Sequence, residues 1–301
     1  MRIVTRPDFD GIVCAVLLQA AETIDAPICW IEPSDIQKGT VSIRAGDILA
    51  NLPYHPQCSL WFDHHFSNQV HVPFKGAWRL APSAAGVIHG FYRDRLGSRF
   101  DDLVQQADKI DAAELTQEEV QQPERHPYIL LSMTISGRDR KDKPYWNLLV
   151  AELGRKSIDA VMALPEVADR CGRVVAENLS YRDFLLAHTK LYGHVAVTDM
   201  RAAPDVPDGN RFLSYSLFPE CSVHVKARRD GRNPQRVSIS VGHSIFNRTC
   251  RVNVGVMLSS FEGGGHRGAG GCSVDAARAD AYLSQIISIL KENAPNDAPQ
   301  S

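Results

Sequence analysis

The stretch LWFDHH at 60–65 has the strongest consequence for the fold, because an apolar run ends there in one carboxylate and two consecutive imidazoles. Residues 58–62, bounded by a proline before them and a polar turn after them, predict a short buried strand. The carboxyl end of a strand in an open α/β sheet is where such sheets bind ligands. Asp63 with His64 or His65 offers the oxygen and nitrogen atoms that divalent metals accept, so the stretch predicts a metal site.

The alternative interpretation of this stretch is an aspartate that orients one neighbouring histidine in a surface loop. Side chains alternate along an extended chain, so His64 and His65 are expected to face opposite ways. Only one of the two imidazoles then needs to be a metal ligand.

The composition predicts a globular protein of two domains, because 301 residues exceed a typical single domain. The net charge of −2 gives no overall attraction to nucleic acid or membranes, so a polyanionic substrate must meet a local cluster or a metal. The seven cysteines are scattered without a Cys-x-x-Cys pair, which argues against a zinc ribbon and a disulfide framework. No run approaches the ~18 apolar residues of a membrane span, and Arg2 leads straight into a strand, so we expect a cytoplasmic protein without a membrane partner.

A second group of acids follows the first expected strand, residues 3–5. Asp8 and Asp10 lie in the loop 6–11, ahead of a strongly apolar helix expected at 12–21. An extended loop points both carboxylates to the same side, as a bridging metal site requires. The alternative is that Asp10 is the N-cap of the helix. Strand, acidic loop and buried helix together are typical of the start of an α/β domain.

Three further acids have ordinary structural explanations as well. Asp47 precedes an expected strand and is equally a turn residue. Asp108 and Asp111 lie three apart on an expected helix, so they share one face, as the residues of a solvated acidic face also do. Around these acids we expect strands at 28–31, 41–43 and 48–52, and helices at 84–92 and 103–113.

The composition changes most at 136–144, where six of nine residues are charged, and we place a domain boundary there. The expected fold class is α/β, with a mostly parallel N-terminal sheet flanked by helices, a helical connector that continues to 192, and a smaller C-terminal α/β domain with a mixed sheet. The expected ranges are 1–140 for the N-terminal domain, 141–192 for the connector, 193–295 for the C-terminal domain and 296–301 for a tail.

The stretch EGGGHRGAGG at 262–271 is the second informative segment. Successive glycines leave the backbone free to approach a ligand and to aim N–H groups at an anion, and two basic side chains follow them. A flexible linker is the alternative, but a strand is expected directly afterwards. The stretch therefore predicts a phosphate-binding site made by Gly263, Gly264, Gly265, His266 and Arg267.

Taken in order, these motifs resemble the DHH phosphoesterase superfamily with its DHH-associated C-terminal domain, in the branch of exopolyphosphatase-related proteins and oligoribonucleases. The resemblance covers nearly the whole chain and implies a metal-binding catalytic N-terminal domain and a substrate-binding C-terminal domain. It also implies a phosphoesterase that hydrolyses short oligonucleotides or phosphorylated nucleotides by a two-metal mechanism, with two Mn²⁺ ions and Mg²⁺ as the alternative. Carried over onto this sequence, the metal ligands are Asp8, Asp10, Asp47, Asp63, His64 and Asp111, with Asp108 as the alternative to Asp111.

The same resemblance implies a catalytic group of Asp63, His64 and His65, in which His65 orients the site or touches the substrate. One position departs from the pattern, since many members carry a metal-binding histidine four residues before Asp8, where this chain has Val4. A catalytically silent nucleotide-binding sensor is therefore one alternative, and an exopolyphosphatase of the same fold is the other. The expected partner is a small phosphorylated substrate or a short single-stranded oligonucleotide, and a homodimer is left open.

Overall fold

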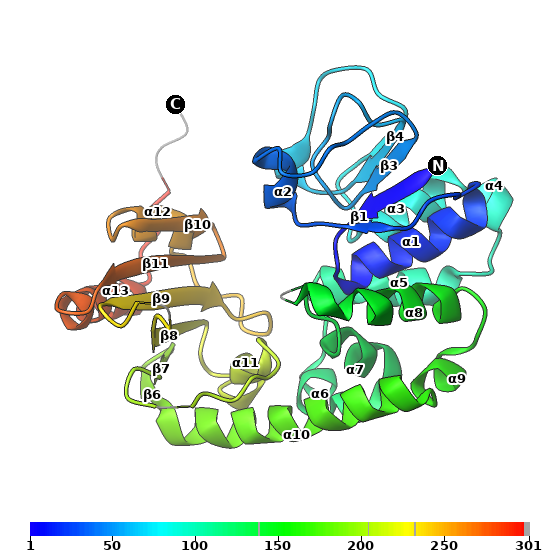
Figure 1. Cartoon of the computed structure of the whole chain (residues 1–301). Helices are drawn as coiled ribbons and strands as arrows, with labels where there is room; N and C mark the ends of the chain where they lie inside the picture. Colours follow the sequence, from blue (N-terminus) through cyan, green and yellow to red (C-terminus); the bar gives the residue numbers. More distant parts are fainter. Residues whose placement is uncertain (138, 204, 232, 298–301) are drawn as a thin grey trace. The chain divides into compact units, whose positions relative to one another are not determined.

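The computed structural model describes residues 1–137, 139–203, 205–231 and 233–297, and the chain packs as two compact units (Figure 1). Unit 1 contains Met1–Leu115 and Pro123–Arg173, and unit 2 contains Thr116–Gln122 and the chain from Val174 onward. The division falls within the long helix α10 (Pro165–His188), whereas the sequence placed boundaries at 140 and 192. The functional domains expected at 1–140, 141–192 and 193–295 stay a prediction, and most of the expected tail, 298–301, lies outside the described residues.

Unit 1 contains a parallel sheet in the order β2-β1-β3-β4-β5. Every neighbouring pair in it is parallel, so the carboxyl ends of its strands meet at one edge. This confirms the expected fold class and places the ends of β1, β3 and β4 side by side. The strands are β1 (Arg2–Thr5), β2 (Cys29–Trp30), β3 (Asp47–Ala50), β4 (Leu60–Asp63) and β5 (Gly76–Trp78).

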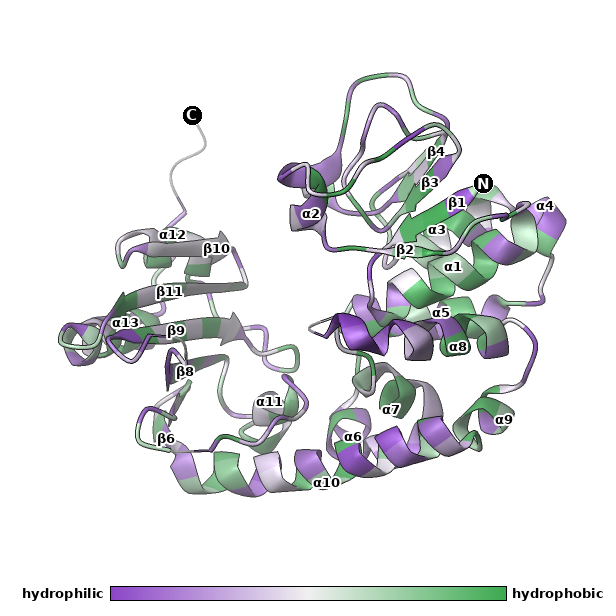
Figure 2. Ribbon diagram, viewed as in Figure 1, coloured by the Kyte–Doolittle hydropathy of each residue, from purple (hydrophilic) through white to green (hydrophobic). Residues whose placement is uncertain are grey.

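Helix α1 (Phe9–Ala21) is the central helix of unit 1 and packs against β1, α3, α5 and α8. Its residues from Phe9 to Leu18 are all buried, and its ribbon is largely green in Figure 2. A helix with so little polar surface is stable only inside a core. The other helices of unit 1 are α2 (Pro33–Gln37), α3 (Ala84–Phe91), α4 (Arg93–Leu96), α5 (Asp101–Asp111), α7 (Pro127–Met133), α8 (Lys143–Leu153) and α9 (Ile158–Met162).

The opposite face of this sheet is covered by loops. Val4, Leu49 and Trp61 are neighbours across β1, β3 and β4 and form one buried cluster with Ile43. The expected strand at 41–43 is wrong, because this segment packs Ile43 into the cluster without pairing with a neighbouring strand.

Unit 2 contains a six-stranded mixed sheet in the order β10-β11-β9-β8-β7-β6, which confirms the expected mixed sheet. β7 and β8 are parallel and the other neighbours are antiparallel. One face packs valine and isoleucine side chains of β7, β8 and β9 against α12 and α13. The elements of unit 2 besides α10 are α6 (Gln117–Gln121), β6 (Thr189–Tyr192), β7 (Val195–Asp199), α11 (Leu213–Leu217), β8 (Val223–Arg229), β9 (Arg236–His243), α12 (Val254–Ser259), β10 (Gly263–His266), β11 (Ala269–Asp275) and α13 (Ala279–Glu292).

Two sequence expectations for unit 2 are corrected by this sheet. The helical pattern expected to run to Tyr192 ends at His188, because Thr189–Tyr192 pairs with β7 as an edge strand. The glycine stretch is itself strand β10, paired in register with β11.

Within the described residues, none of the helices combines the length and the hydropathy that crossing a membrane requires.

Candidate metal centre

Helix α1 positions the two aspartates of the first loop differently from the sequence expectation. The helix begins at Phe9, so Asp10 lies in its first turn and Asp8 is the N-cap, accepting the backbone N–H of Gly11 at 2.8 Å. The expectation of two carboxylates side by side in an extended loop is therefore wrong. Asp10, for which the N-cap was the alternative interpretation, instead accepts the backbone N–H groups of Ala84 and Ala85 at 3.0 and 2.8 Å, at the start of α3.

The carboxylate of Asp10 is fully enclosed and lies among other acids. Burial raises its pKa well above the usual value, and the charges of Asp111 and Asp8 raise it further. Burial likewise raises the pKa of Asp111, with Asp8 as the next cause. Acids that raise one another's pKa in this way form a site that favours a bound cation.

His64, which follows β4, completes this group. Its Nδ1 lies 3.0 Å from the carbonyl oxygen of Ala81, and since a carbonyl only accepts, Nδ1 carries the hydrogen. The other ring nitrogen, Nε2, is buried without a hydrogen-bond partner. It lies 3.3 Å from Asp111 Oδ2 and 4.0 Å from Asp10 Oδ2. Three acceptor atoms converge here, and a cation between them removes their mutual repulsion.

Asp63, the last residue of β4, is completely buried beside this group. Its Oδ1 lies 2.9 Å from Nδ1 of His65, and its Oδ2 accepts from Nδ2 of Asn68 at 2.7 Å. The hydrogen bond to Asp63 raises the pKa of His65 above its usual value, against the opposing effect of burial. Asp63 therefore holds His65 in place, while His64 turns to the acids of α1 and α5.

The structure separates the two acids of α5. Asp108 accepts a hydrogen bond from the hydroxyl of Ser83, the N-cap of α3, at 2.5 Å. Asp111, one turn later, faces His64. Of the two alternatives, Asp111 is the one that lies in the candidate metal centre.

Asp47 does not lie with these residues. It is the first residue of β3, in register with Arg2 at the start of β1, and so occupies the opposite edge of the sheet. There it accepts from Arg2 Nε and Nη2 at 2.8 and 2.6 Å. A carboxylate paired with arginine at the amino end of a strand cannot reach ligands at the carboxyl ends, so Asp47 is excluded from this centre.

Asn51 occupies the place expected for Asp47, and the sequence analysis missed it. It directly follows β3, and its Nδ2 donates to Asp8 Oδ1 at 3.1 Å. The signal was available, because Asn51 ends an apolar strand just as Asp63 does.

The predicted phosphate-binding residues lie in unit 2, in the β10–β11 hairpin. Gly263, Gly264 and Gly265 pair with Cys272, Gly271 and Gly270. Successive N–H groups of a strand point in opposite directions, so these glycines do not form the anion-binding concavity expected from the sequence. His266 is exposed, and the guanidinium of Arg267 forms an ion pair with Asp297.

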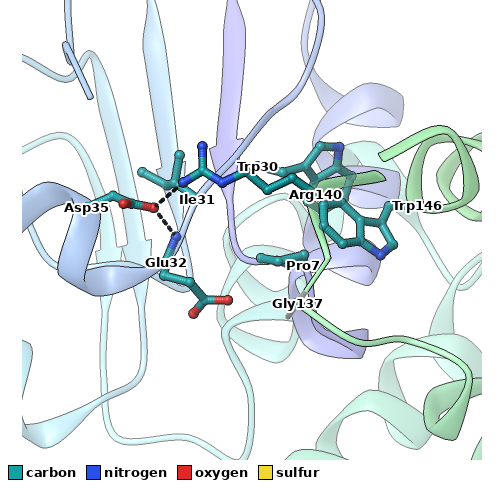
Figure 3. A pocket seen from close by; sticks show the side chains of 8 residues that line it. All are labelled: Pro7, Trp30, Ile31, Glu32, Asp35, Gly137, Arg140 and Trp146. Carbon is teal, nitrogen blue, oxygen red and sulfur yellow. Dashed lines mark hydrogen bonds and ion pairs between the residues drawn. The ribbon is translucent and has the colours of Figure 1, made fainter. Parts of the chain in front are cut away.

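A pocket of about 210 Å³, its open mouth included, borders the loop of unit 1 that carries Asp8 (Figure 3). Pro7, which precedes Asp8, lines it together with the indoles of Trp30 and Trp146. On the other side, Arg140 pairs with Asp35 at 3.2 Å. None of the proposed metal ligands lines this pocket.

The donor atoms of the centre fit a divalent metal. The unpartnered Nε2 of His64 and the carboxylates of Asp10 and Asp111 form a group whose atoms lie within 4.8 Å of one another. The second ring nitrogen of His64 is held by a carbonyl, as is usual for a histidine that binds metal. Carboxylates with a single imidazole suit Mn²⁺ or Mg²⁺ better than zinc.

Comparisons with solved structures identify proteins that share this fold. The pGpG-specific phosphodiesterase PggH from Vibrio cholerae is 30% identical, with a TM-score of 0.87 over 97% of this chain and 99% of that protein. An exopolyphosphatase-related protein from Bacteroides fragilis is 13% identical, with a TM-score of 0.56 over 97% of this chain and 92% of the other. RecJ from Thermus thermophilus, solved in complex with Mn²⁺, is 16% identical, with a TM-score of 0.59 over 99% of this chain and 52% of RecJ. No protein-family model and no curated protein matches the chain.

The similarity to the phosphodiesterase extends over nearly the full length of both chains. This chain belongs to the DHH phosphoesterase superfamily, as the order of its motifs implied. The relative at 30% identity is a phosphodiesterase, an enzyme that hydrolyses a phosphoric ester bond.

Proposed function

We propose that this protein is a manganese-dependent phosphodiesterase that hydrolyses short linear oligonucleotides, with the dinucleotide pGpG as the first substrate to test. The observation that carries the proposal is the buried, unpartnered Nε2 of His64 facing the carboxylates of Asp10 and Asp111. The full-length similarity to a pGpG-specific phosphodiesterase supports the choice of substrate.

In this proposal Asp10, His64 and Asp111 hold the ion. When bound, a divalent metal lowers the pKa of a water molecule and polarises the phosphate. The chain's own contribution is to fix the ligands, through the α3 backbone N–H groups on Asp10 and the Ala81 carbonyl on His64. A water oxygen then forms a bond to phosphorus while the bond to the 3′ oxygen breaks, so that pGpG gives two molecules of GMP.

His65 has a different part in the proposed reaction. Its ring is held through Nδ1 by the buried Asp63, while its side chain is 38% exposed. It is therefore fixed but accessible, as a residue that touches the substrate must be. This exposure supports the proposal that His65 contacts the substrate beside the scissile phosphate.

The basic residues of unit 2 support a short substrate over a long polyanion. Affinity for a polyanion rises with the number of phosphates that Lys and Arg neutralise. Arg229 donates from Nε to the carbonyl oxygen of Arg201 at 3.0 Å, and Arg236 donates to the carbonyl oxygen of Ser273. Both guanidinium groups are thus engaged at the β8–β9 hairpin, while Arg232 lies outside the described residues. With these two guanidinium groups already hydrogen-bonded to backbone carbonyls, the hairpin favours a short substrate over a long polyphosphate chain.

The test compares turnover of pGpG, a second dinucleotide, 3′-phosphoadenosine-5′-phosphate and long-chain polyphosphate, with Mn²⁺ and with a chelator. We expect metal-dependent hydrolysis, and faster cleavage of the dinucleotides or the bisphosphorylated nucleotide than of polyphosphate. A clear preference for polyphosphate would establish the exopolyphosphatase alternative. Binding of pGpG without turnover under any metal condition would instead indicate the silent nucleotide-binding sensor.

A further inference from the structure

Asp8 is enclosed by hydrogen-bond donors of its own chain. Its Oδ1 accepts from the backbone N–H of Gly11 at 2.8 Å and from Nδ2 of Asn51 at 3.1 Å. Its Oδ2 faces the guanidinium of Arg6, with Nη1 3.2 Å away. Both oxygens of Asp8 therefore have partners, and one partner carries a positive charge.

Two other positions around Asp8 lack the ligands that the family resemblance implies. Val4, where many members carry a metal-binding histidine, is fully buried in the apolar cluster of the sheet. Asn51, at the end of β3, is a neutral amide whose Nδ2 donates to Asp8. Asn51 Oδ1 is buried without a hydrogen-bond partner. Val4 and Asn51 together thus offer a metal ion one neutral oxygen and no charged ligand.

A count of charges shows why this environment disfavours a second dication. A histidine and two carboxylates would present a net charge of −2 to an ion at this position. Here Val4 and Asn51 contribute no charge, and Arg6 balances Asp8. Asp63 forms a second candidate metal group with His64 and His65, but both of its oxygens already accept hydrogen bonds, from His65 and Asn68. Hard dications require anionic oxygen ligands to offset the loss of their water shell, so a single neutralised carboxylate binds them weakly.

Arg6 is held beside the centre from both sides. In addition to its ion pair with Asp8, its Nε lies 3.6 Å from Oε2 of Glu32, which follows β2. That distance is too long for a hydrogen bond, and Nε is buried without one. Arg6 is thus a partly buried guanidinium with unused hydrogen-bonding capacity at the carboxyl edge of the sheet. Because a guanidinium is planar and presents several N–H groups, it can bind two oxygens of a phosphate at once.

We propose that this chain holds a single divalent ion, at Asp10, His64 and Asp111, and that the guanidinium of Arg6 takes the place of the second ion. In this arrangement Arg6 binds a non-bridging oxygen of the phosphate and stabilises the negative charge that develops on it. The role of Arg6 on the phosphate rests on the proposed function, whereas the number of ions does not.

The first experiment counts ions in the full-length protein by calorimetric titration with Mn²⁺ and by electron paramagnetic resonance. We expect one tightly bound ion per chain, with the spectrum of an isolated Mn²⁺. Two ions of similar affinity, or the exchange-coupled spectrum of a pair, would overturn the proposal. A chain that binds one ion and hydrolyses no phosphodiester would contradict the proposed function and leave the ion count intact.

The second experiment changes the charge around Asp8. The double variant Arg6→Gln, Asn51→Asp removes a positive charge and adds a negative one, so we expect it to bind a second Mn²⁺. Arg140→Gln is the matched control, because Arg140 pairs with Asp35 at the same edge of the sheet without touching Asp8. It should still bind one ion. A double variant that is folded by circular dichroism and binds only one ion would show that charge does not decide the count.

A third measurement tests the part of Arg6 in the reaction. Arg6→Ala should keep its single Mn²⁺ and lose about 10²-fold or more in kcat, as expected when a donor to developing charge is removed. Arg6→Lys should recover part of this loss. Unchanged kcat in Arg6→Ala would exclude the guanidinium from the chemistry.

Discussion

Asp111 places Oδ2 3.3 Å from Nε2 of His64, while Asp108, one turn earlier on α5, accepts a hydrogen bond from Ser83 at 2.5 Å. Two acids on one helical face thus have different partners, a candidate metal ligand and a helix cap. A helical face carries both side chains to the same region, and the length of one turn decides which partner each meets.

This relationship predicts different effects for two matched substitutions. Asp111→Asn removes a charged ligand, so we expect the Mn²⁺ affinity and the turnover of the variant to fall by more than about 100-fold. This exceeds the effect of changing a residue that only hydrogen-bonds to a ligand. Asp108→Asn changes only the hydrogen bond to Ser83, and its Mn²⁺ affinity should fall by less than about tenfold. Calorimetric titration with Mn²⁺ measures both variants. The reverse order would move the metal ligand to Asp108.

Asp63 supports a second prediction, because it is buried and bonded to both His65 and Asn68. Asp63→Asn keeps the shape of the side chain and removes a buried charge beside the three proposed ligands, so the variant should fold, bind Mn²⁺ up to about 100-fold more weakly and lose activity by orders of magnitude. Asn68→Ala is the control, since it deletes one hydrogen bond to Asp63 and leaves the charge. Wild-type metal content in Asp63→Asn would show that this carboxylate does not contribute to the centre.

The sequence patterns predicted the mostly parallel sheet, whereas the family resemblance implied Asp10, His64 and Asp111 as ligands and left Asp108 as the alternative to Asp111. Apolar runs ending in polar residues indicate strands whose carboxyl ends meet, and that arrangement follows from a parallel sheet. The first residue of α1 was harder to predict, because Asp8 and Asp10 both fit an N-cap. Which of them caps the helix depends on Ala84 and Ala85, whose N–H groups bind Asp10 from a segment more than seventy residues away.

Asp47 shows more clearly why the sequence alone does not decide which acids lie in the site. An acid beside an apolar run can lie at either end of the strand, and only pairing decides which. The register places Asp47 beside Arg2, and the ion pair between them then fixes it at the amino edge. Likewise, the three successive glycines predicted a phosphate-binding backbone, whereas they pair with β11 as strand β10. The close approach of α12 to this strand requires a glycine on the helix, because an added Cβ on Gly255 would lie 2.3 Å from the carbonyl oxygen of Gly265.

A third prediction concerns the pH dependence of stability. His224 on β8 is buried between the hydroxyls of Thr198 and Ser214, each 2.6 Å from a ring nitrogen. Burial lowers its pKa well below the usual 6.5, with the charge of Lys226 as a smaller cause. The unfolded chain takes up a proton near pH 6.5 and the folded chain does not, so this contribution is complete above that pH and is lost as the pH falls below it.

The expected loss is up to about 1.4 kcal/mol in the free energy of unfolding for each pH unit below 6.5. Urea unfolding at several pH values measures it. His224→Gln lacks the titrating group, so its stability should fall less steeply over the same range. Parallel curves for the two proteins would rule out His224 as a source of the acid sensitivity.

The last prediction concerns Arg267, which follows β10 and forms an exposed ion pair with Asp297. An exposed pair contributes little to stability, so the guanidinium remains available to a phosphate. Because the sequence predicts that Arg267 binds the phosphate of the substrate without taking part in the chemistry, Arg267→Ala should raise KM for pGpG more than it lowers kcat. Arg278→Ala is the control, since Arg278 is similarly exposed and pairs with Glu262 at 2.7 Å. Its KM should stay at the wild-type value. A fall in kcat with unchanged KM in Arg267→Ala would instead assign this residue to the transition state.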